Sequence, residues 1–226
     1  MNYGIVLAAG KGTRFGKEKQ LLLLKKKPLF YYSLKTFLNS SFIYQCVFVV
    51  PQGQGNYYQS LLKKHFKKLE QKKIILCEGG ETRQESVKKG IHTLLLKNPF
   101  CEQDKVLIHD AARPFITQQA ILTVLEELKN YLAVTLGYPM QDALKKAHKN
   151  GEVIKELNRE AVWGISTPQG FCAKTLYSLL KENTAPFYDE TALFTQKGFK
   201  VKIVLCPFFN LKITYPWDWE LAQKLL

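Results

Sequence analysis

The sequence predicts a single α/β domain over residues 1–226, in which helices flank a mostly parallel, twisted sheet. Short, continuous apolar runs that suit buried strands alternate with segments whose apolar residues recur at helical spacing, and this alternation is typical of parallel sheets with right-handed crossovers. No linker, repeat or low-complexity stretch divides the 226 residues, which are enough to bury one core. Ligands of such sheets bind beyond the carboxyl ends of the strands, so the segments that follow strands are the candidate sites.

The predicted elements alternate along most of the chain. The run that begins at Ile5 is the first strand, and continuous apolar runs predict further strands at residues 45–50, 73–77, 105–109, 132–136 and 200–205. Helical spacing predicts helices at residues 30–38, 57–68, 85–96, 118–131, 173–181, 190–196 and 217–226. Pro28 marks the start of the first helix, and Thr117 is the expected N-cap of the fourth.

The first strand runs into a tight, glycine-rich loop. Three glycines there can take positive φ and let the backbone approach a ligand closely: Gly10, Gly12 and Gly16. Four cations lie within nine positions: Lys11, Arg14, Lys17 and Lys19. Exposed N–H groups and cationic side chains in one loop favour a polyphosphate ligand, although a glycine turn with solvated lysines is the alternative.

Two well-known phosphate loops do not fit this stretch. The dinucleotide fingerprint requires a glycine where Phe15 stands, and the next strand ends without an acidic residue for a ribose. The Walker loop requires four residues between its glycines and then Lys-Ser/Thr, whereas five residues separate Gly10 from Gly16, and Glu18 follows Lys17. The loop is therefore expected to bind a polyphosphate in another way.

Two further segments follow predicted strands. Gly79-Gly80 turns the chain after residues 73–77. The backbone amides of this turn and the Ser86 hydroxyl can form hydrogen bonds with the edge of a base. Arg83 fits equally well at this site or on the open surface. Asp110 and Arg113 lie just past the strand at 105–109, so a carboxylate and a guanidinium face the same crevice as the glycine loop. A carboxylate beside a polyphosphate is typical of a magnesium ligand or a ribose anchor; a structural Asp110–Arg113 salt bridge is the alternative.

Residues 138–160 do not follow the strand–helix alternation. Asn150-Gly151 is a strong hairpin signal between two β-like segments, which predicts a projecting β-arm. The apolar residues of the arm need cover: Leu144, Ala147, Val153 and Leu157. We expect a second copy of the chain to provide it, which predicts a homodimer.

Composition limits the other functional classes. The formal charge of +14 and a lysine-rich segment at 63–73 raise nucleic-acid binding as an option, but we find no aromatic stacking platform and no nucleic-acid motif, so we expect no such partner. No apolar run reaches the roughly 18 residues that would span a bilayer, and we expect a cytoplasmic protein without membrane association. The five cysteines are scattered without zinc-ligand spacing and are expected to be reduced packing residues.

Five motifs, in order along essentially the whole chain, resemble those of the 2-C-methyl-D-erythritol 4-phosphate cytidylyltransferase family. They are residues 7–20, Gly80–Val87, His109–Phe115, Thr167–Gln169 and Asn210–Thr214. The resemblance implies a Rossmann-like nucleotidyltransferase fold, CTP and a sugar-alcohol phosphate as substrates, pyrophosphate as a product, and Mg²⁺ or another divalent cation. Ribitol-5-phosphate cytidylyltransferases share much of this pattern and are the alternative. A nucleotide-binding protein without catalysis is the second alternative, but it would not need Arg159 and Lys212.

The resemblance also implies roles for individual residues. The catalytic residues would be Arg14, Lys19, Arg159 and Lys212, with Arg159 reaching the acceptor phosphate from the other subunit. The substrate-binding residues would be Ala8, Ala9, Gly10, Lys11, Gly12, Gly80, Glu81, Ser86, Asp110, Ala111, Arg113 and Thr167. Among these, Gly80, Glu81 and Ser86 would meet cytosine, Asp110 and Ala111 would hold the ribose, and Arg113 and Thr167 would complete the acceptor pocket. Asp110 would also bind the metal.

The chain departs from the family pattern at three positions. Ala143 stands where relatives carry a threonine, which removes a hydroxyl expected to touch the acceptor phosphate. Cys206 replaces a frequent glycine, and Phe209 replaces a frequent acidic residue. None of these changes removes a charge from the catalytic set, so we expect activity with a weaker acceptor affinity.

Overall fold

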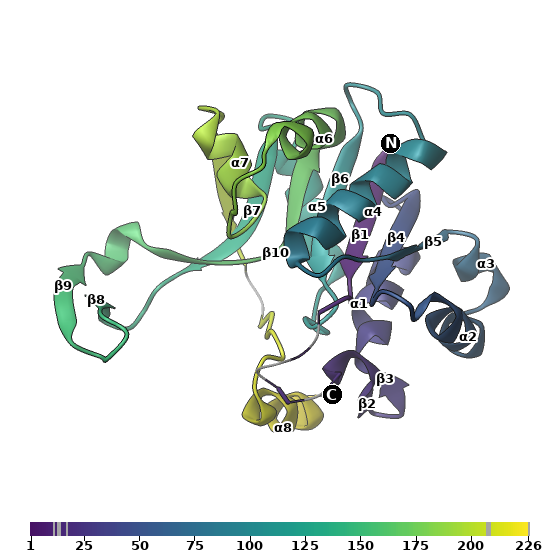
Figure 1. Ribbon diagram of the computed structural model, residues 1–226, viewed down its shortest axis with the longest axis horizontal. Coiled ribbons are helices and arrows are strands. Elements are labelled where there is room, and N and C mark those ends of the chain that lie inside the picture. The colour runs from purple at the N-terminus through teal and green to yellow at the C-terminus, as the bar shows by residue number, and fades with distance from the viewer. Residues whose placement is uncertain (11, 13–14, 17, 207–208, 226) are drawn as a thin grey trace.

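The computed structural model describes residues 1–10, 12, 15–16, 18–206 and 209–225. Within these residues the core is a seven-stranded twisted sheet with helices on both faces (Figure 1). In spatial order its strands are β11 (Val201–Leu205), β7 (Ala133–Pro139), β10 (Trp163–Cys172), β6 (Lys105–Asp110), β1 (Asn2–Leu7), β4 (Gln45–Val50) and β5 (Ile74–Glu78). All neighbours pair in parallel except β10, which is antiparallel to both β6 and β7. The predicted mostly parallel α/β fold is confirmed.

Eight α-helices lie in the described part of the chain. Their bounds are α1 (Leu29–Asn39), α2 (Gly55–His65), α3 (Lys68–Gln71), α4 (Arg83–Lys97), α5 (Gln118–Glu127), α6 (Ala173–Glu182), α7 (Thr191–Gln196) and α8 (Pro216–Leu225). One face of the sheet packs against α1, α2 and α5, and the other against α4, α6 and α7. The two layers explain why strands such as β4 are buried almost throughout.

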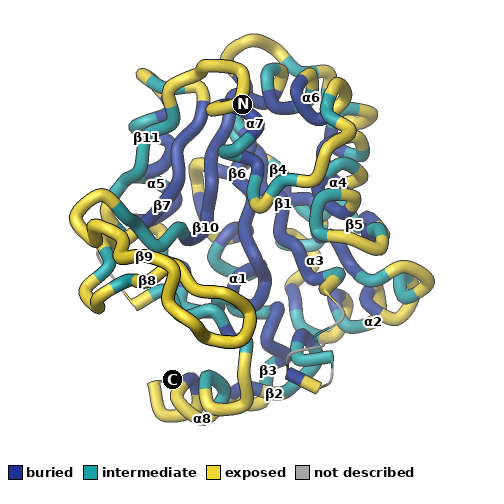
Figure 2. Tube along the Cα trace, turned by 60° about the vertical axis from the view of Figure 1, so that its left-hand side comes forward, coloured by how far each residue is buried: buried dark blue, intermediate teal, exposed yellow. Residues whose placement is uncertain are grey.

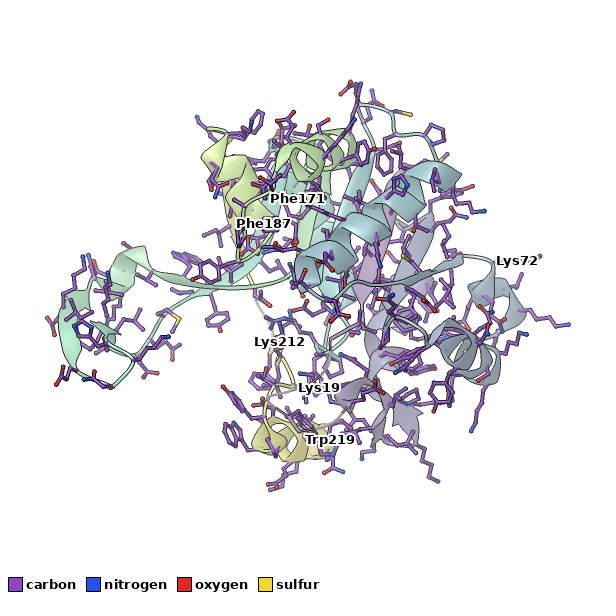
Figure 3. All side chains as sticks on the ribbon, viewed as in Figure 1. Lys19, Lys72, Phe171, Phe187, Lys212 and Trp219 are labelled. Atoms are coloured by element: carbon purple, nitrogen blue, oxygen red, sulfur yellow. The ribbon has the colours of Figure 1, made fainter. Side chains whose placement is uncertain are left out.

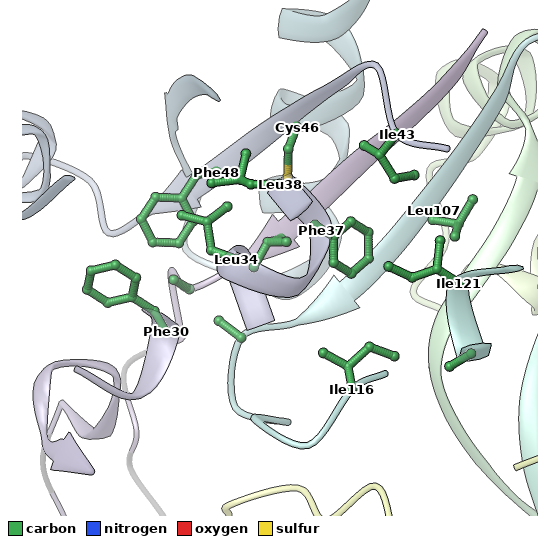
Figure 4. Packing of buried hydrophobic residues seen from close by; sticks show 14 of the residues in the cluster. Phe30, Leu34, Phe37, Leu38, Ile43, Cys46, Phe48, Leu107, Ile116 and Ile121 are labelled. Atoms are coloured by element: carbon green, nitrogen blue, oxygen red, sulfur yellow. The ribbon is translucent and has the colours of Figure 1, made fainter. Parts of the chain in front are cut away.

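The first layer is formed by large apolar side chains at helical spacing. Phe30, Leu34, Phe37 and Leu38 of α1 recur at intervals of three or four residues and are all buried. Figure 4 shows them packed toward β4 and β6, with Phe30 and Phe48 ring centroids 5.0 Å apart. Burying each such side chain contributes roughly 1.5–3 kcal/mol, so this layer accounts for much of the driving force for folding.

A smaller cluster joins the segment that follows β1 to the C-terminal segment. Helix α8 lies near the short hairpin of β2 (Leu23–Leu24) and β3 (Lys27–Pro28) in Figure 1. Leu24, Ile213 and Ala222 are buried together with Phe15, whose ring meets Trp219 edge to face at 6.3 Å. The segment around Lys212 is therefore held against the segment that follows β1.

The predicted β-arm is a hairpin of β8 (Leu144–Ala147) and β9 (Val153–Leu157), which projects from the body of the chain (Figure 1). The predicted turn residue Gly151 has a φ of +93° and donates its N–H to His148 O at 3.0 Å, whereas Asn150 does not have positive φ, so the loop is longer than a two-residue Asn-Gly turn. Leu144 pairs with Leu157 and Ala147 with Val153, so the four predicted apolar residues are cross-strand partners. Figure 2 shows that most of the arm is exposed.

Several observed elements differ from the prediction. Strand β10 was not predicted, although it lies in the middle of the sheet. The helix predicted at residues 57–68 is split, because Phe66 is extended with a φ of −120° and is buried in the core between α2 and α3. The helix predicted at 118–131 ends at Glu127, while its predicted N-cap Thr117 accepts a hydrogen bond from Ala120 N at 3.2 Å.

None of the helices in the described ranges combines the length and the apolar character needed to cross a membrane.

Candidate active site

The predicted post-strand segments meet at one cavity of about 250 Å³ beyond the carboxyl ends of β1, β5 and β6. From the first loop, Ala9, Gly10, Gly12 and Lys19 line it. From the later segments, Gly80, Glu81, Ser86, Asp110 and Lys212 line it. Figure 3 shows Lys19 and Lys212 at the same end of the sheet, although 193 positions of sequence separate them (212 − 19). The fold thus gathers cations from both ends of the chain.

The glycine loop follows directly from β1. Ala8 N donates to Val49 O at 2.7 Å, which keeps this residue aligned with β4 and fully buried. Gly12 has a φ of +66°, and Gly12 O accepts hydrogen bonds from Phe15 N and Gly16 N. Gly16 also has positive φ, whereas Gly10 does not. The predicted residues Lys11 and Arg14 lie outside the described residues.

The turn after β5 forms a second wall. A Cβ atom on Gly79 would lie 2.6 Å from both Ala9 Cβ and Ser86 Oγ, so only glycine lets these segments approach so closely. Ser86 Oγ accepts a hydrogen bond from Gly80 N at 3.1 Å and donates to Thr82 O at 2.9 Å. The helix begins earlier than predicted, because Thr82 is its N-cap and accepts from Glu85 N. Backbone groups are thus fixed along this side of the cavity.

Asp110, the last residue of β6, is the electrostatic centre of the cavity. Lys212 Nζ lies 2.6 Å from Asp110 Oδ2, Arg83 Nε 3.6 Å from Oδ1, and Arg113 Nε 3.9 Å from Oδ2. Burial opposes ionisation, but the charges of Lys212, Arg83 and Arg113 outweigh it and hold the pKa of Asp110 far below its usual range. The carboxylate therefore stays ionised among three cations. The predicted alternative, an Asp110–Arg113 ion pair, is present as the longest of these contacts.

The backbone of Asp110 is fixed through Thr167. Asp110 N donates to Thr167 Oγ1 at 3.3 Å, and the same hydroxyl lies 2.9 Å from His109 Nδ1. His109 Nε2 lies 3.2 Å from Arg113 O, and burial lowers the pKa of His109 to about 4, so the imidazole is neutral at pH 7. Because the Arg113 carbonyl oxygen can only accept a hydrogen bond, the ring proton is assigned to Nε2, and Nδ1 accepts from the Thr167 hydroxyl. Thr167 and Ala111 are buried behind the cavity and do not line it.

Contacts from the C-terminal segment hold Lys212 and Arg113. Arg113 Nη1 donates to Asn210 O at 2.8 Å, while its buried Nε has no hydrogen-bond partner among the described residues. Ile213 N donates to Ala112 O at 2.8 Å, next to Lys212. Asp218, in the first turn of α8, accepts hydrogen bonds from Thr214 N at 2.7 Å and from Tyr215 N at 2.8 Å. The turn that carries Lys212 is therefore anchored on both sides.

The sequence left the place of one functional-site residue open and missed another. Arg83, which the sequence placed equally well at the site or on the surface, lines the cavity and forms an ion pair with Glu190. Glu190 is fully buried at the start of α7, and no sequence motif distinguishes it, because its partner lies 107 residues away. Arg159, by contrast, was predicted as a catalytic residue but lies on the arm, in the short helix η2 (Arg159–Ala161). There its Nη1 donates to Gln141 O at 2.8 Å. It does not line the cavity of its own chain.

Metal binding at this site rests on one carboxylate. No group of three or more His, Cys, Asp or Glu side chains suited to a metal occurs within the part of the chain that the structure describes. Mg²⁺ commonly binds through one or two carboxylates together with substrate phosphates, so Asp110 fits a cation that a nucleotide brings with it. It does not fit a cation held by protein ligands alone.

Nearly the whole chain matches one protein family. The family model described as 2-C-methyl-D-erythritol 4-phosphate cytidylyltransferase matches residues 3–226. The chain belongs to this family. The 2-C-methyl-D-erythritol 4-phosphate cytidylyltransferase of Alkaliphilus metalliredigens is 34% identical to this chain, over 98% of this chain and 91% of that protein. The enzyme of the same name from Aquifex aeolicus is also 34% identical, over 100% and 98%.

Solved structures of this cytidylyltransferase family have the same fold. The 2-C-methyl-D-erythritol 4-phosphate cytidylyltransferase of Francisella tularensis superimposes with a TM-score of 0.82 at 27% identity, over 100% of this chain and 99% of that one. The 4-diphosphocytidyl-2C-methyl-D-erythritol synthase of Anaerococcus prevotii gives a TM-score of 0.83 at 25% identity, over 100% and 95%. The family predicted from five sequence motifs is thereby confirmed, while the roles of single residues stay predictions.

Proposed function

We propose that this chain transfers the cytidylyl group of CTP to 2-C-methyl-D-erythritol 4-phosphate and releases pyrophosphate. One observation carries the proposal: Lys19 and Lys212, from opposite ends of the sequence, line one cavity with the ionised Asp110. A phosphate oxygen of the acceptor attacks the α-phosphorus of CTP, and the bond from that phosphorus to the pyrophosphate oxygen breaks. Such a transfer needs alignment and dispersal of negative charge more than covalent participation by the protein.

Each wall of the cavity has a role in this proposal. The backbone around Gly10 and Gly12 holds the triphosphate, and Gly80, Glu81 and Ser86 meet the cytosine. Lys19 and Lys212 disperse the charge that develops on the phosphate oxygens, with Lys11 and Arg14 as further predicted cations. Asp110 anchors the ribose and holds Mg²⁺ or another divalent cation together with phosphate oxygens; when bound, that cation neutralises phosphate charge. Arg113 does not line the cavity itself; its Nε is buried without a hydrogen-bond partner among the described residues, 3.9 Å from Asp110 Oδ2, and we assign it to the acceptor pocket.

The test measures pyrophosphate release from CTP in the presence and absence of 2-C-methyl-D-erythritol 4-phosphate. Release that depends on this acceptor supports the proposal. Replacing it with ribitol 5-phosphate distinguishes the two related cytidylyltransferases. Binding of CTP without release with either acceptor would favour the non-catalytic alternative instead.

We also propose that the arm joins two chains and that Arg159 serves the partner's site. Val153 is 62% exposed and Ile154 45% exposed, so the arm presents apolar surface, and Arg159 is remote from the cavity of its own chain. Mixing a Lys19→Ala chain with an Arg159→Ala chain tests both parts. Each mixed dimer would contain one intact site, so random mixing should restore about one quarter of wild-type activity. A mixture as inactive as its two components would contradict the proposal.

A further inference from the structure

Glu190 is a fully buried carboxylate that does not line the cavity. Arg83 Nη1 donates to both of its oxygens, at 2.8 Å each. A buried charge needs a partner, but a buried ion pair is weak evidence of a stabilising role, because well-packed apolar residues often stabilise a fold equally well. Stability alone therefore does not explain why the Arg83–Glu190 ion pair is buried at this position.

Arg83 connects this buried carboxylate to the centre of the cavity. Its Nη1 faces Glu190, while its Nε lies 3.6 Å from Asp110 Oδ1. A guanidinium is planar and rigid, so fixing one nitrogen on Glu190 determines where Nε points. Lys212 occupies the other oxygen of Asp110 at 2.6 Å. The two oxygens of Asp110 thus face different cations, and this arrangement sets the rotation of the carboxylate.

The charge of Glu190 also limits how strongly Arg83 attracts Asp110. Burial opposes the charge of Arg83, but Glu190 and Asp110 together outweigh it and raise the pKa of the guanidinium. Because Glu190 takes the short contacts, the contact to Asp110 stays at 3.6 Å, longer than a hydrogen bond. Without the charge of Glu190, Arg83 would be drawn onto Asp110 and would compete with the nucleotide for it.

A second contact fixes the same elements independently. Gln84 Nε2, next to Arg83 in the first turn of α4, donates to Phe187 O at 2.5 Å. The segment that carries Glu190 is therefore docked on the helix turn that also carries the Gly80–Ser86 wall of the cavity.

We infer that Glu190 is a positioning residue of the nucleotide site, which acts through Arg83 to keep the Asp110 carboxylate oriented for CTP. The inference rests on the proposed function, since it assigns CTP to this cavity. It predicts a larger effect on the binding of CTP than on the binding of the acceptor, because Arg83 belongs to the Gly80–Ser86 wall and its Nε lies 3.6 Å from Asp110 Oδ1.

The test compares Glu190→Gln with wild-type protein. We expect the KM for CTP and the calorimetric Kd for CTP with Mg²⁺ to rise roughly tenfold or more, which corresponds to the loss of one charge-assisted interaction. The KM for the acceptor should stay within about twofold of the wild-type value. Glu182→Gln is the matched control, because Glu182 forms an exposed ion pair with Lys197 at 3.0 Å on neighbouring elements. It should leave both constants unchanged.

A double-mutant cycle shows whether Glu190 acts through Arg83. The double variant Arg83→Gln/Glu190→Gln should bind CTP no more weakly than Arg83→Gln alone. If Glu190→Gln does not fold, Arg83→Lys provides the test, since a lysine beside Glu190 cannot reach both carboxylates as a guanidinium does, and the CTP constants should rise in the same way. CTP constants within about twofold of wild type in the folded variant, or additive effects in the cycle, would overturn the inference.

The binding measurement separates this inference from the proposed function. Wild-type protein that binds CTP but releases no pyrophosphate would refute the proposed reaction, and the Kd ratio of the variants would still decide the role of Glu190. Wild-type protein that binds no CTP would refute both.

Discussion

Replacing Lys212 by methionine removes one charge from the cavity and keeps the length of the side chain. In the structure Lys212 Nζ lies 2.6 Å from Asp110 Oδ2, and the lysine side chain is 36% exposed. After the substitution, Arg83 and Arg113 still face Asp110, at 3.6 and 3.9 Å. The carboxylate therefore remains paired, and its charge does not become an isolated charge in the interior.

These contacts set the expected magnitudes. A hydrogen bond to a charged group contributes about 1.5–3 kcal/mol, which we reduce to about 1 kcal/mol because the ammonium is partly exposed and Asp110 keeps two other cations. A typical domain has roughly 5–15 kcal/mol of stability, so the variant should stay folded. Loss of one group that stabilises developing phosphate charge costs about 3 kcal/mol in the transition state, a decrease in kcat of roughly a hundredfold or more.

Steady-state pyrophosphate release, together with urea unfolding, checks both magnitudes. Lys197→Met is the matched control, because Lys197 forms an ion pair of similar length with Glu182 away from the cavity. It should keep wild-type kcat. A Lys212→Met protein that folds and retains kcat within about threefold of wild type would refute the role assigned to Lys212.

Three further predictions test other parts of the site. Lys19→Ala should abolish detectable CDP-alcohol formation with an unchanged circular dichroism spectrum, and near wild-type turnover would refute its role. The pKa of His109 is lowered by burial from 6.5 to about 4, so the fold favours the neutral ring: this contribution is complete above about pH 6.5 and is lost as pH falls toward 4, a change of about 3 kcal/mol. Urea unfolding at pH 7 and pH 4.5 should therefore show a larger loss of stability in wild type than in His109→Gln, and equal losses would contradict this. Gly79→Ala places a Cβ atom 2.6 Å from Ala9 Cβ and Ser86 Oγ, so it should cost roughly 1–3 kcal/mol of stability and weaken CTP binding; a thermal melt and a CTP titration that match wild type would rule out the clash.

Local patterns predicted most of the elements, and their failures have physical causes. Strand β4 was predicted with the observed bounds, because a strand buried on both faces is a continuous apolar run. Strand β10 was missed because it contains Pro168 and Gly170, which normally disfavour strands. The sheet accommodates them through a register shift between Ser166 and Gln169. Phe66 divides a predicted helix because its ring packs into the core, a contact between distant segments that no helical spacing reveals.

In the candidate site, too, local patterns were predictable and contacts between distant segments were not. Residues at or just past the ends of strands, such as Asp110 and Gly80, were predicted because the carboxyl ends of parallel strands share one edge. Arg83 was left undecided and Glu190 was not recognised, since their pairing depends on how α7 packs against α4. That packing is a property of the assembled fold and not of either segment alone.

The arm begins and ends on neighbouring strands of the sheet. Pro139 at the end of β7 pairs with Trp163 at the start of β10, and Met140 N donates to Val162 O at 3.3 Å. The intervening residues therefore form an excursion that closes on itself at its base. Insertions or deletions within it would change how far the hairpin extends without altering the register of the central strands. The length of the hairpin can thus be redesigned independently of the central sheet.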